Sequence, residues 1–255
     1  MNTSPSSAGP IVFCDFDGTI TELDVTDGIL TRFADPAWMK IEQQWVGGEI
    51  GSRQCLERQM ALVRASAKDL NALIDLVRLD PHFTEFCRLL WEWAVPFYVL
   101  SDGFDYVIRR ILRRAGLTST LGNGSHLFAS SLRINDGRVW TSFPHPPLAC
   151  EHGCATCKPS VMRSLGAGHS PSIFIGDGLS DRFAAEESDL VFAKNRLLEY
   201  CRDQGIACIP FETFADIATA LRSLLDLGEA GTRRKGYKPV TKTAELGTLI
   251  TPLDS

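Results

Sequence analysis

The sequence lacks long apolar runs, a basic leader segment and an excess of positive charge. Its first ten residues (MNTSPSSAGP) have neither the basic nor the apolar segment of a signal peptide, and no later apolar run is long enough to cross a bilayer. We therefore expect a cytoplasmic protein that binds no membrane. The formal net charge of −5 argues against nucleic-acid binding, whereas a local cationic pocket could still bind a small phosphorylated metabolite.

The composition is otherwise typical of a soluble globular protein. Hydrophobic residues make up 44% and charged residues 22% of the 255 residues, which suits one large domain or a core with a smaller partner. Eight cysteines are present. In a reducing compartment we expect them to be free thiols or metal ligands rather than a disulfide framework.

An apolar run near the amino terminus ends in two acids. Residues 11–14 (IVFC) are typical of a buried parallel strand, and Asp15 and Asp17 follow directly. Because side chains alternate along a strand, both carboxylates project in the same direction. Two like charges in one small space require a divalent cation such as Mg²⁺ or a shared proton. The pattern predicts Asp15 as a nucleophile and Asp17 as general acid and base, and the alternative is a surface turn with two acids.

The apolar spacing changes from strand-like to helical after residue 22. Four or so short helical stretches fit the spacing up to residue 82, and the last two run to Val63 and Val77. The chain then returns to strand character. We therefore expect residues 23–82 to form a helical cap over the end of the first strand, and the alternative is a helical layer of the same domain.

A second apolar run also ends in polar residues. Residues 96–100 (PFYVL) are followed by Ser101, Asp102 and Gly103, and we expect a helix to start near Phe104. A hydroxyl, free backbone amides and the positive end of a helix can bind phosphate oxygens. The alternative is an ordinary helix N-cap, for which Ser and Asp are favoured.

A cysteine-rich stretch follows a predicted hairpin. Residues 125–143 alternate around an Asn-Asp-Gly turn, which predicts the β-hairpin. Next come Cys150, Cys154 and Cys157, with His152 among them. Three thiols and an imidazole could complete a tetrahedral zinc site. A loop disulfide or free cysteines are the alternatives, because the stretch is more compact than a two-knuckle zinc ribbon.

A lysine and two further acids complete the set of polar strand ends. Lys158 precedes Pro159, which is typical of the first residue of a helix, so Lys158 could neutralise a phosphate or an acid there. A solvated lysine is the alternative. A third apolar strand (SIFIG) ends at Asp177, with Asp181 one helical turn later. We expect Asp177 to complete a metal site and Asp181 to brace Lys158 or the waters of that metal.

The predicted fold class is α/β, a three-layer Rossmann-like core with a parallel sheet and an inserted helical cap. The core comprises residues 10–22 and 83–228, including the hairpin, the cysteine-rich loop and two later strand-helix units. We expect the polar tail, residues 229–255, to be disordered.

The order of these motifs is that of a known family. The segments DFDGT, SDG, Lys158 and GDGLSD resemble the four motifs of the haloacid dehalogenase superfamily, in its phosphatase branch. The resemblance implies that Asp15 is the nucleophile and Asp17 the acid and base. It implies phosphate binding by Ser101 and Lys158, and Mg²⁺ bound by Asp15, Asp177 and the backbone carbonyl of Asp17.

A narrower resemblance bears on the substrate. The segments DPAWMK, CATCKPSV and SDLVFAKNRLLEYCR resemble the methionine-salvage subgroup, which implies 2-hydroxy-3-keto-5-methylthiopentenyl-1-phosphate as substrate. Phosphoserine and phosphocholine or phosphoethanolamine phosphatases are similar too, although Asp24 stands where phosphoserine phosphatases place a substrate-binding glutamate. A phosphotransferase and a non-catalytic metabolite- or zinc-binding protein are the alternatives of another class.

We expect side chains of the cap to select the substrate, since the residues at the strand ends contact only the phosphate and the metal. Asp24 and Arg53 are the candidates, because polar groups that meet substrate oxygens discriminate more strongly than apolar walls. Trp38 is a third candidate. It shares a helical face with Ile41 and Trp45, which favours a place in the core of the cap instead.

Overall fold

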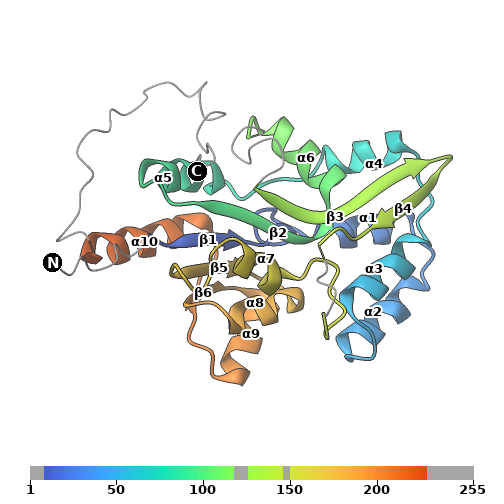
Figure 1. Cartoon of the computed structure of the whole chain (residues 1–255). Coiled ribbons are helices and arrows are strands. Elements are labelled where there is room, and N and C mark those ends of the chain that lie inside the picture. The colour runs from blue at the N-terminus through green and yellow to red at the C-terminus, as the bar shows by residue number, and fades with distance from the viewer. Residues whose placement is uncertain (1–8, 118–125, 146–149, 229–255) are drawn as a thin grey trace.

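A mostly parallel sheet forms the centre of the protein (Figure 1). The computed structural model describes residues 9–117, 126–145 and 150–228. Within them, seven strands have the order β4-β3-β2-β1-β5-β6-β7, and β3 with β4 is the one antiparallel pair. The strands are β1 (Ile11–Cys14), β2 (Phe97–Phe104), β3 (Leu127–Asn135), β4 (Arg138–Ser142), β5 (Ser172–Gly176), β6 (Leu190–Ala193) and β7 (Ile209–Pro210). The predicted α/β class is confirmed.

Helices cover both faces of the sheet and give three layers. They are α5 (Phe83–Glu92), α6 (Asp105–Arg114), α7 (Lys158–Ser164), α8 (Arg182–Glu186), α9 (Asn195–Gln204) and α10 (Phe214–Gly228). Helices α5, α6 and α10 pack with Val12 and Cys14 of β1 in one apolar cluster. Helices α7, α8 and α9 pack with Ile11 and Phe13 in another, on the opposite side of the sheet (Figure 1). The alternation along β1 follows from the two-residue period of a strand, and all four of its residues are buried.

Strand β1 lies between β2 and β5; β1 and β5 end almost level with each other, while β2 continues to Phe104. Cys14 is level with Val99 of β2 and with Ile175 of β5. The backbone N–H of Asp15 donates to the carbonyl of Ile175 at 2.9 Å. The residues that follow these strands, Asp177 among them, therefore meet at one edge of the sheet.

Four helices separate β1 from α5. They are α1 (Val25–Phe33), α2 (Trp38–Val46), α3 (Ser52–Met60) and α4 (Ala67–Ile74). Helices α3 and α4 end earlier than predicted, since Val63 and Val77 lie outside them. Val63 instead forms an isolated antiparallel bridge with Ala34, an extended conformation that suits a β-branched residue.

Helices α1 and α4 are joined to the sheet core, and α2 and α3 pack on each other while Met60 of α3 also reaches the apolar cluster of the core. Buried residues of α1 and α4 belong to the same apolar cluster as β1. Arg110 of α6 makes a two-point ion pair with Asp75, with distances of 2.8 and 2.6 Å. The hydroxyl of Tyr106 donates to Asn71 at 2.8 Å. That residues 23–82 act as a separate cap stays a prediction.

Strands β3 and β4 form a hairpin, with Asn135 paired to Arg138. Asp136 and Gly137 make its two-residue turn with φ values of 48° and 71°, the conformation for which Asp-Gly is favoured. This is the predicted hairpin, apart from its first residue, which lies outside the described residues. The tail predicted to be disordered, residues 229–255, also lies outside them. Among the described helices, none combines the length and apolar content needed to cross a membrane.

Candidate active site

A buried lysine connects two acids at the carboxyl edge of the sheet. The Nζ atom of Lys158 donates to Oδ1 of Asp15 at 2.6 Å and also to Oδ1 of Asp181. Lys158 is 1% exposed and Asp181 is fully buried. Burial alone would lower the pKa of Lys158, but the charges of Asp15, Asp181 and Asp102 raise that pKa above its ordinary value. The lysine is therefore a permanent cation behind Asp15 and not a solvated side chain.

A cavity of about 320 Å³ lies in front of these acids. Its floor is formed by the residues that end or follow β1, β2 and β5, namely Asp15, Asp17, Ser101, Asp102, Gly103 and Asp177. Its opposite wall comes from α1 to α3 and from the start of α9, with Asp24, Asp27, Glu42, Trp45, Gln59 and Arg196. The cavity thus lies between the carboxyl edge of the sheet and the inserted helices, where ligands bind in open α/β sheets.

Asp17 is half-buried at the floor of this cavity. One carboxyl oxygen accepts a hydrogen bond from the backbone N–H of Val25 at 3.2 Å. Gly103 approaches the other oxygen so closely that a Cβ atom there would lie 2.1 Å from it, so any larger residue would displace the carboxyl. Burial, opposed by the Val25 hydrogen bond and aided by the charge of Asp177, raises the pKa of Asp17 to about 7. At neutral pH both protonation states are populated, as an acid-base group requires.

Three carboxylates form a candidate metal group. Oxygen atoms of Asp15, Asp177 and Asp181 lie within 4.8 Å of one another. The hydroxyl of Thr19 and the side-chain amide of Asn195 donate to Asp177 at 2.8 and 3.2 Å. Burial, followed by the charge of Asp181, raises the pKa of both Asp15 and Asp177. A cation relieves such crowding, and a donor set made only of oxygen suits Mg²⁺.

Asp181 already has partners for both of its oxygens. One accepts from Lys158, and the other accepts from the backbone N–H groups of Asp177 and Gly178, both at 3.0 Å. Asp181 is absent from the described residues that line the cavity. These contacts favour the predicted brace of Lys158 over the other predicted role of Asp181, at the metal and its waters.

The polar residues of β2 have separate partners. The buried hydroxyl of Ser101 accepts from the backbone N–H of Gly103 at 2.9 Å. The carboxylate of Asp102 accepts from the backbone N–H of Thr156 at 2.9 Å and so holds the cysteine-rich loop. The strand runs on to Phe104, and its pairing with β3 is irregular in this segment. The polar residues therefore lie within the distorted end of the strand rather than after it.

The three residues predicted to contact the substrate beyond its phosphate differ in their positions relative to the cavity. Asp24 lines the cavity, and its carboxylate also caps α1 by accepting from the N–H of Asp27 at 2.9 Å. Arg53 is exposed and does not belong to the described lining, and its guanidinium lies 5.5 Å from the ring centre of Phe143. This position does not support Arg53 as a substrate contact. Trp38 packs against the main apolar cluster, the place that its helical spacing favours.

Several residues of the cavity wall were not predicted from the sequence as site residues. Asp27 stands one helical turn after Asp24, and Trp45 one turn after Glu42, so helical spacing indicates that each pair shares a face. Arg196 follows β6, the neighbour of β5, and the same reasoning from strand ends that found Asp177 would have found it. No other pattern in the sequence indicated that Glu42 and Trp45 line the cavity, because the face of α2 that meets the cavity depends on tertiary packing.

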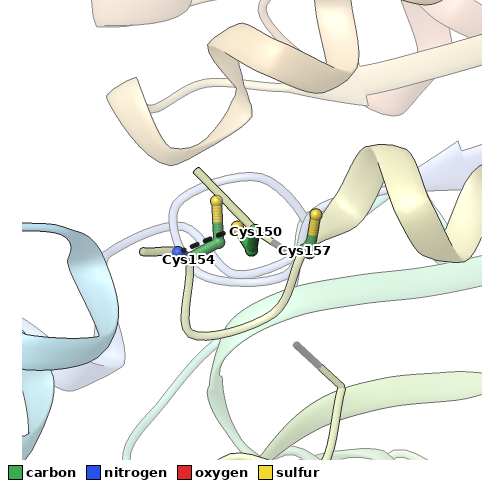
Figure 2. A group of neighbouring side chains, drawn as sticks. All are labelled: Cys150, Cys154 and Cys157. Atoms are coloured by element: carbon green, nitrogen blue, oxygen red, sulfur yellow. Dashed lines mark hydrogen bonds between the residues drawn. The ribbon is translucent and has the colours of Figure 1, made fainter. Parts of the chain in front are cut away.

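Three cysteines form a second group of possible ligands (Figure 2). All eight cysteines are free thiols, so the disulfide alternative is not present. The sulfur atoms of Cys150, Cys154 and Cys157 lie within 4.8 Å of one another. His152 does not join them, contrary to its predicted role as a ligand, because its ring stacks on Phe183 with centroids 3.8 Å apart.

The chain is similar to proteins of a known family. The model of a family described as haloacid dehalogenase-like hydrolase matches residues 12–186. A 2-hydroxy-3-keto-5-methylthiopentenyl-1-phosphate phosphatase of Bacillus thuringiensis subsp. konkukian is 31% identical over 219 residues, which cover 85% of this chain and 97% of that protein. The phosphatase of the same name from Geobacillus kaustophilus is 32% identical, with 84% and 96% covered. A substrate-bound phosphoserine phosphatase has a similar fold, with a TM-score of 0.62, 18% identity, and 87% and 99% covered.

Proposed function

The chain belongs to the haloacid dehalogenase-like hydrolase family, and on that premise we propose that it hydrolyses a small phosphomonoester through an aspartyl-phosphate on Asp15. Its relatives are phosphatases, and it is a phosphoric monoester hydrolase of the same family. One arrangement carries the proposal. Lys158 contacts Asp15 at 2.6 Å, and Asp17, whose pKa is about 7, stands beside them on the floor of the cavity.

Asp15 is the nucleophile of this proposal. Its ionised carboxylate needs no base to activate it. Lys158 favours that ionised form, because its charge opposes the burial and the acids that raise the pKa of Asp15. Since Lys158 holds Oδ1, the oxygen left to attack phosphorus is Oδ2. The new bond between oxygen and phosphorus forms as the ester oxygen departs.

Asp17 moves the protons. In its protonated form it donates to the departing ester oxygen, so that the leaving group is a neutral alcohol. The carboxylate that results then accepts a proton from water as the water oxygen attacks the aspartyl-phosphate. Inorganic phosphate is released, Asp15 is free again, and Asp17 has regained its proton. A pKa near 7 suits both halves of this cycle.

The oxygen donors at the floor fit Mg²⁺. Asp15, Asp177 and the backbone carbonyl of Asp17 would hold the ion, and Thr19 and Asn195 fix Asp177 for that task. When bound, Mg²⁺ supplies positive charge that neutralises phosphate oxygens and the crowded carboxylates. Asp177→Asn should therefore raise the Mg²⁺ concentration needed for half-maximal turnover.

The proposed substrate is 2-hydroxy-3-keto-5-methylthiopentenyl-1-phosphate, the compound in the names of the two relatives. The wall of the cavity combines acids with the apolar surfaces of Trp45 and Leu56. The carboxyls of Asp24 and Glu42, whose pKa values burial raises, meet the cavity and can hydrogen-bond to hydroxyl groups of the substrate. A methylthio group suits the apolar surfaces, because sulfur packs favourably against aromatic rings.

The acids of the wall also favour a second candidate, a phosphomonoester that carries an ammonium group. Asp24, Asp27 and Glu42 share this wall with a single cation among the described lining residues, Arg196. In their ionised form these acids attract a cation, and Trp45 offers a ring face to it. Phosphocholine and phosphoethanolamine have this chemistry, whereas phosphoserine adds a carboxylate that the same acids repel.

Colorimetric phosphate release from a panel of phosphomonoesters tests the proposal. The panel contains the methylthiopentenyl phosphate, phosphocholine, phosphoethanolamine, phosphoserine and an aryl phosphate, each with and without Mg²⁺. We expect Mg²⁺-dependent release, with the highest kcat/KM on the methylthiopentenyl phosphate and none from Asp15→Asn. A preference for phosphocholine would favour the second candidate, and hydrolysis that needs no divalent cation would contradict the metal assignment.

A further inference from the structure

A group of three cysteines lies on the loop before α7. Cys150, Cys154 and Cys157 offer three sulfur atoms within 4.8 Å of one another. Figure 2 shows the side chains of Cys154 and Cys157 pointing in the same direction from the loop, with Cys150 between them. We propose that these three side chains bind one zinc ion as thiolates, at a site separate from the acids of the cavity floor.

The spacing of the three sulfur atoms suits zinc. Thiolates about 2.3 Å from a tetrahedral zinc ion lie about 3.8 Å apart, so little movement of the loop is needed. The backbone N–H of Cys154 donates to the sulfur of Cys150 at 3.5 Å, a contact that stabilises a thiolate ligand. Soft sulfur ligands select zinc over magnesium, whereas the acids on the floor have the opposite preference.

Water takes the fourth position of the proposed site. Within the described residues, no histidine, aspartate or glutamate joins the three cysteines as a group. The ring of His152 is held against Phe183 instead. The ring of His145, the histidine between the hairpin and Cys150, is likewise turned to an aromatic partner and lies edge-on to Phe128, with centroids 5.2 Å apart.

The loop that carries the cysteines forms part of the cavity's surroundings. The backbone N–H of Arg53 donates to the carbonyl of Gly153 at 3.0 Å, and that of Ala155 donates to the hydroxyl of Ser52 at 3.0 Å. The loop is held on its other side by Asp102, through the N–H of Thr156. Ser52 and Asp102 both line the cavity.

The bound ion would therefore fix the shape of a loop that contacts two distant parts of the chain. It fixes a loop that connects α3, in the inserted segment, with β2 in the core. Cys157 also directly precedes Lys158, so the same loop sets the start of the helix that carries the buried lysine. This role is structural, and the proposal does not rest on the proposed phosphatase chemistry.

Metal content of the full chain tests the proposal. The protein is purified under reducing conditions, equilibrated with excess zinc, and desalted in the presence of Mg²⁺ to remove zinc from the carboxylates. Elemental analysis should find one zinc per chain in the wild type and in Cys208→Ser, a matched control outside the group. Cys154→Ser and Cys157→Ser should each lower zinc retention at least tenfold.

Cobalt substitution gives a second readout, which remains available if the variants fail to fold. The wild type loaded with Co²⁺ should show a thiolate-to-cobalt charge-transfer band, and Cys208→Ser should show the same band. Absence of that band, absence of zinc from the wild type, or full zinc retention by both cluster variants would overturn the proposal. A disulfide among the three cysteines in the freshly purified protein, found by counting thiols, would overturn it as well. None of these outcomes depends on phosphatase activity.

Discussion

The Nζ atom of Lys158 lies 2.6 Å from Oδ1 of Asp15, although 143 positions separate the two residues in the sequence. Both side chains are almost completely buried, and Asp181 is the second acid that contacts the lysine. A buried ion pair of this kind is costly to break from one side, because the remaining charge loses its partner but stays out of water. The same contact therefore affects both folding and the proposed chemistry.

Removing the lysine should destabilise the protein. In Lys158→Met, Asp15 and Asp181 remain buried without their cation, and we expect the free energy of unfolding to fall by about 3–5 kcal/mol at neutral pH. Urea unfolding of the two proteins measures the difference. Lys68→Met, at an exposed position of α4, is the matched control and should change the free energy of unfolding by less than about 0.5 kcal/mol. Equal stability of Lys158→Met and wild type would contradict the buried pair.

Asp17 should make stability depend on pH in a specific direction. Its pKa is about 7 in the folded protein and about 3.9 in an unfolded chain. Because the folded state binds this proton more tightly, its contribution to stability is complete below about pH 3.9 and is lost as the pH rises through 7. Between pH 5 and 7, wild type should lose stability more steeply than Asp17→Asn, by at most about 1.4 kcal/mol per pH unit.

Urea unfolding at several pH values, without divalent cations, compares the two slopes for Asp17. Because Asp15, Asp24 and Asp177 also have raised pKa values, both proteins should lose stability with pH, and the difference between them reports Asp17. Parallel slopes would show that the carboxyl of Asp17 titrates in its ordinary range.

Gly103 should be required for activity because of its distance from Asp17. A Cβ atom at Gly103 would lie 2.1 Å from Oδ2 of Asp17, so Gly103→Ala must displace that carboxyl. We expect turnover to fall by about two powers of ten or more, as for a misplaced proton donor. Gly28→Ala is the matched control, since the nearest atom to its Cβ is 4.0 Å away, and it should keep wild-type turnover. A fully active Gly103→Ala would place the proton donor elsewhere.

Asp24 should influence which substrate is hydrolysed, and Arg53 should not. Asp24→Ser removes the carboxyl from the cavity but keeps a side chain that can cap α1. We expect kcat/KM on the preferred substrate to fall at least tenfold relative to an aryl phosphate. Arg53→Ala, on the neighbouring surface, should leave this ratio unchanged. A change of the ratio by Arg53→Ala alone would restore the arginine as a substrate contact.

The strand ends could be predicted from the sequence because their signals are local. An apolar run followed at once by acids marks β1 with Asp15 and β5 with Asp177, and parallel pairing brings these ends together. The order of the motifs also indicated the haloacid dehalogenase family, which the family match over residues 12–186 confirms.

The rest of the site depends on tertiary contacts that no local pattern encodes. Proline at the start of α7 indicates a helix, but not that Lys158 points inward to reach Asp15. Arg53 lies over the ring of Phe143 instead of lining the cavity, and His152 stacks on Phe183 instead of joining the cysteines. In each case the deciding partner is distant in the sequence, so spacing alone could not find it.

The central claim is that a phosphoryl group passes through Asp15, and trapping the intermediate tests it most directly. The enzyme is mixed with Mg²⁺ and its best substrate and quenched in acid, where acyl phosphates survive, and its peptides are then analysed by mass spectrometry. We predict one phosphoryl group on the peptide that contains residues 11–19, located on Asp15, sensitive to hydroxylamine, and absent from Asp15→Asn. Rapid turnover with no phosphorylated peptide, or a phosphoryl group on another residue, would contradict the account.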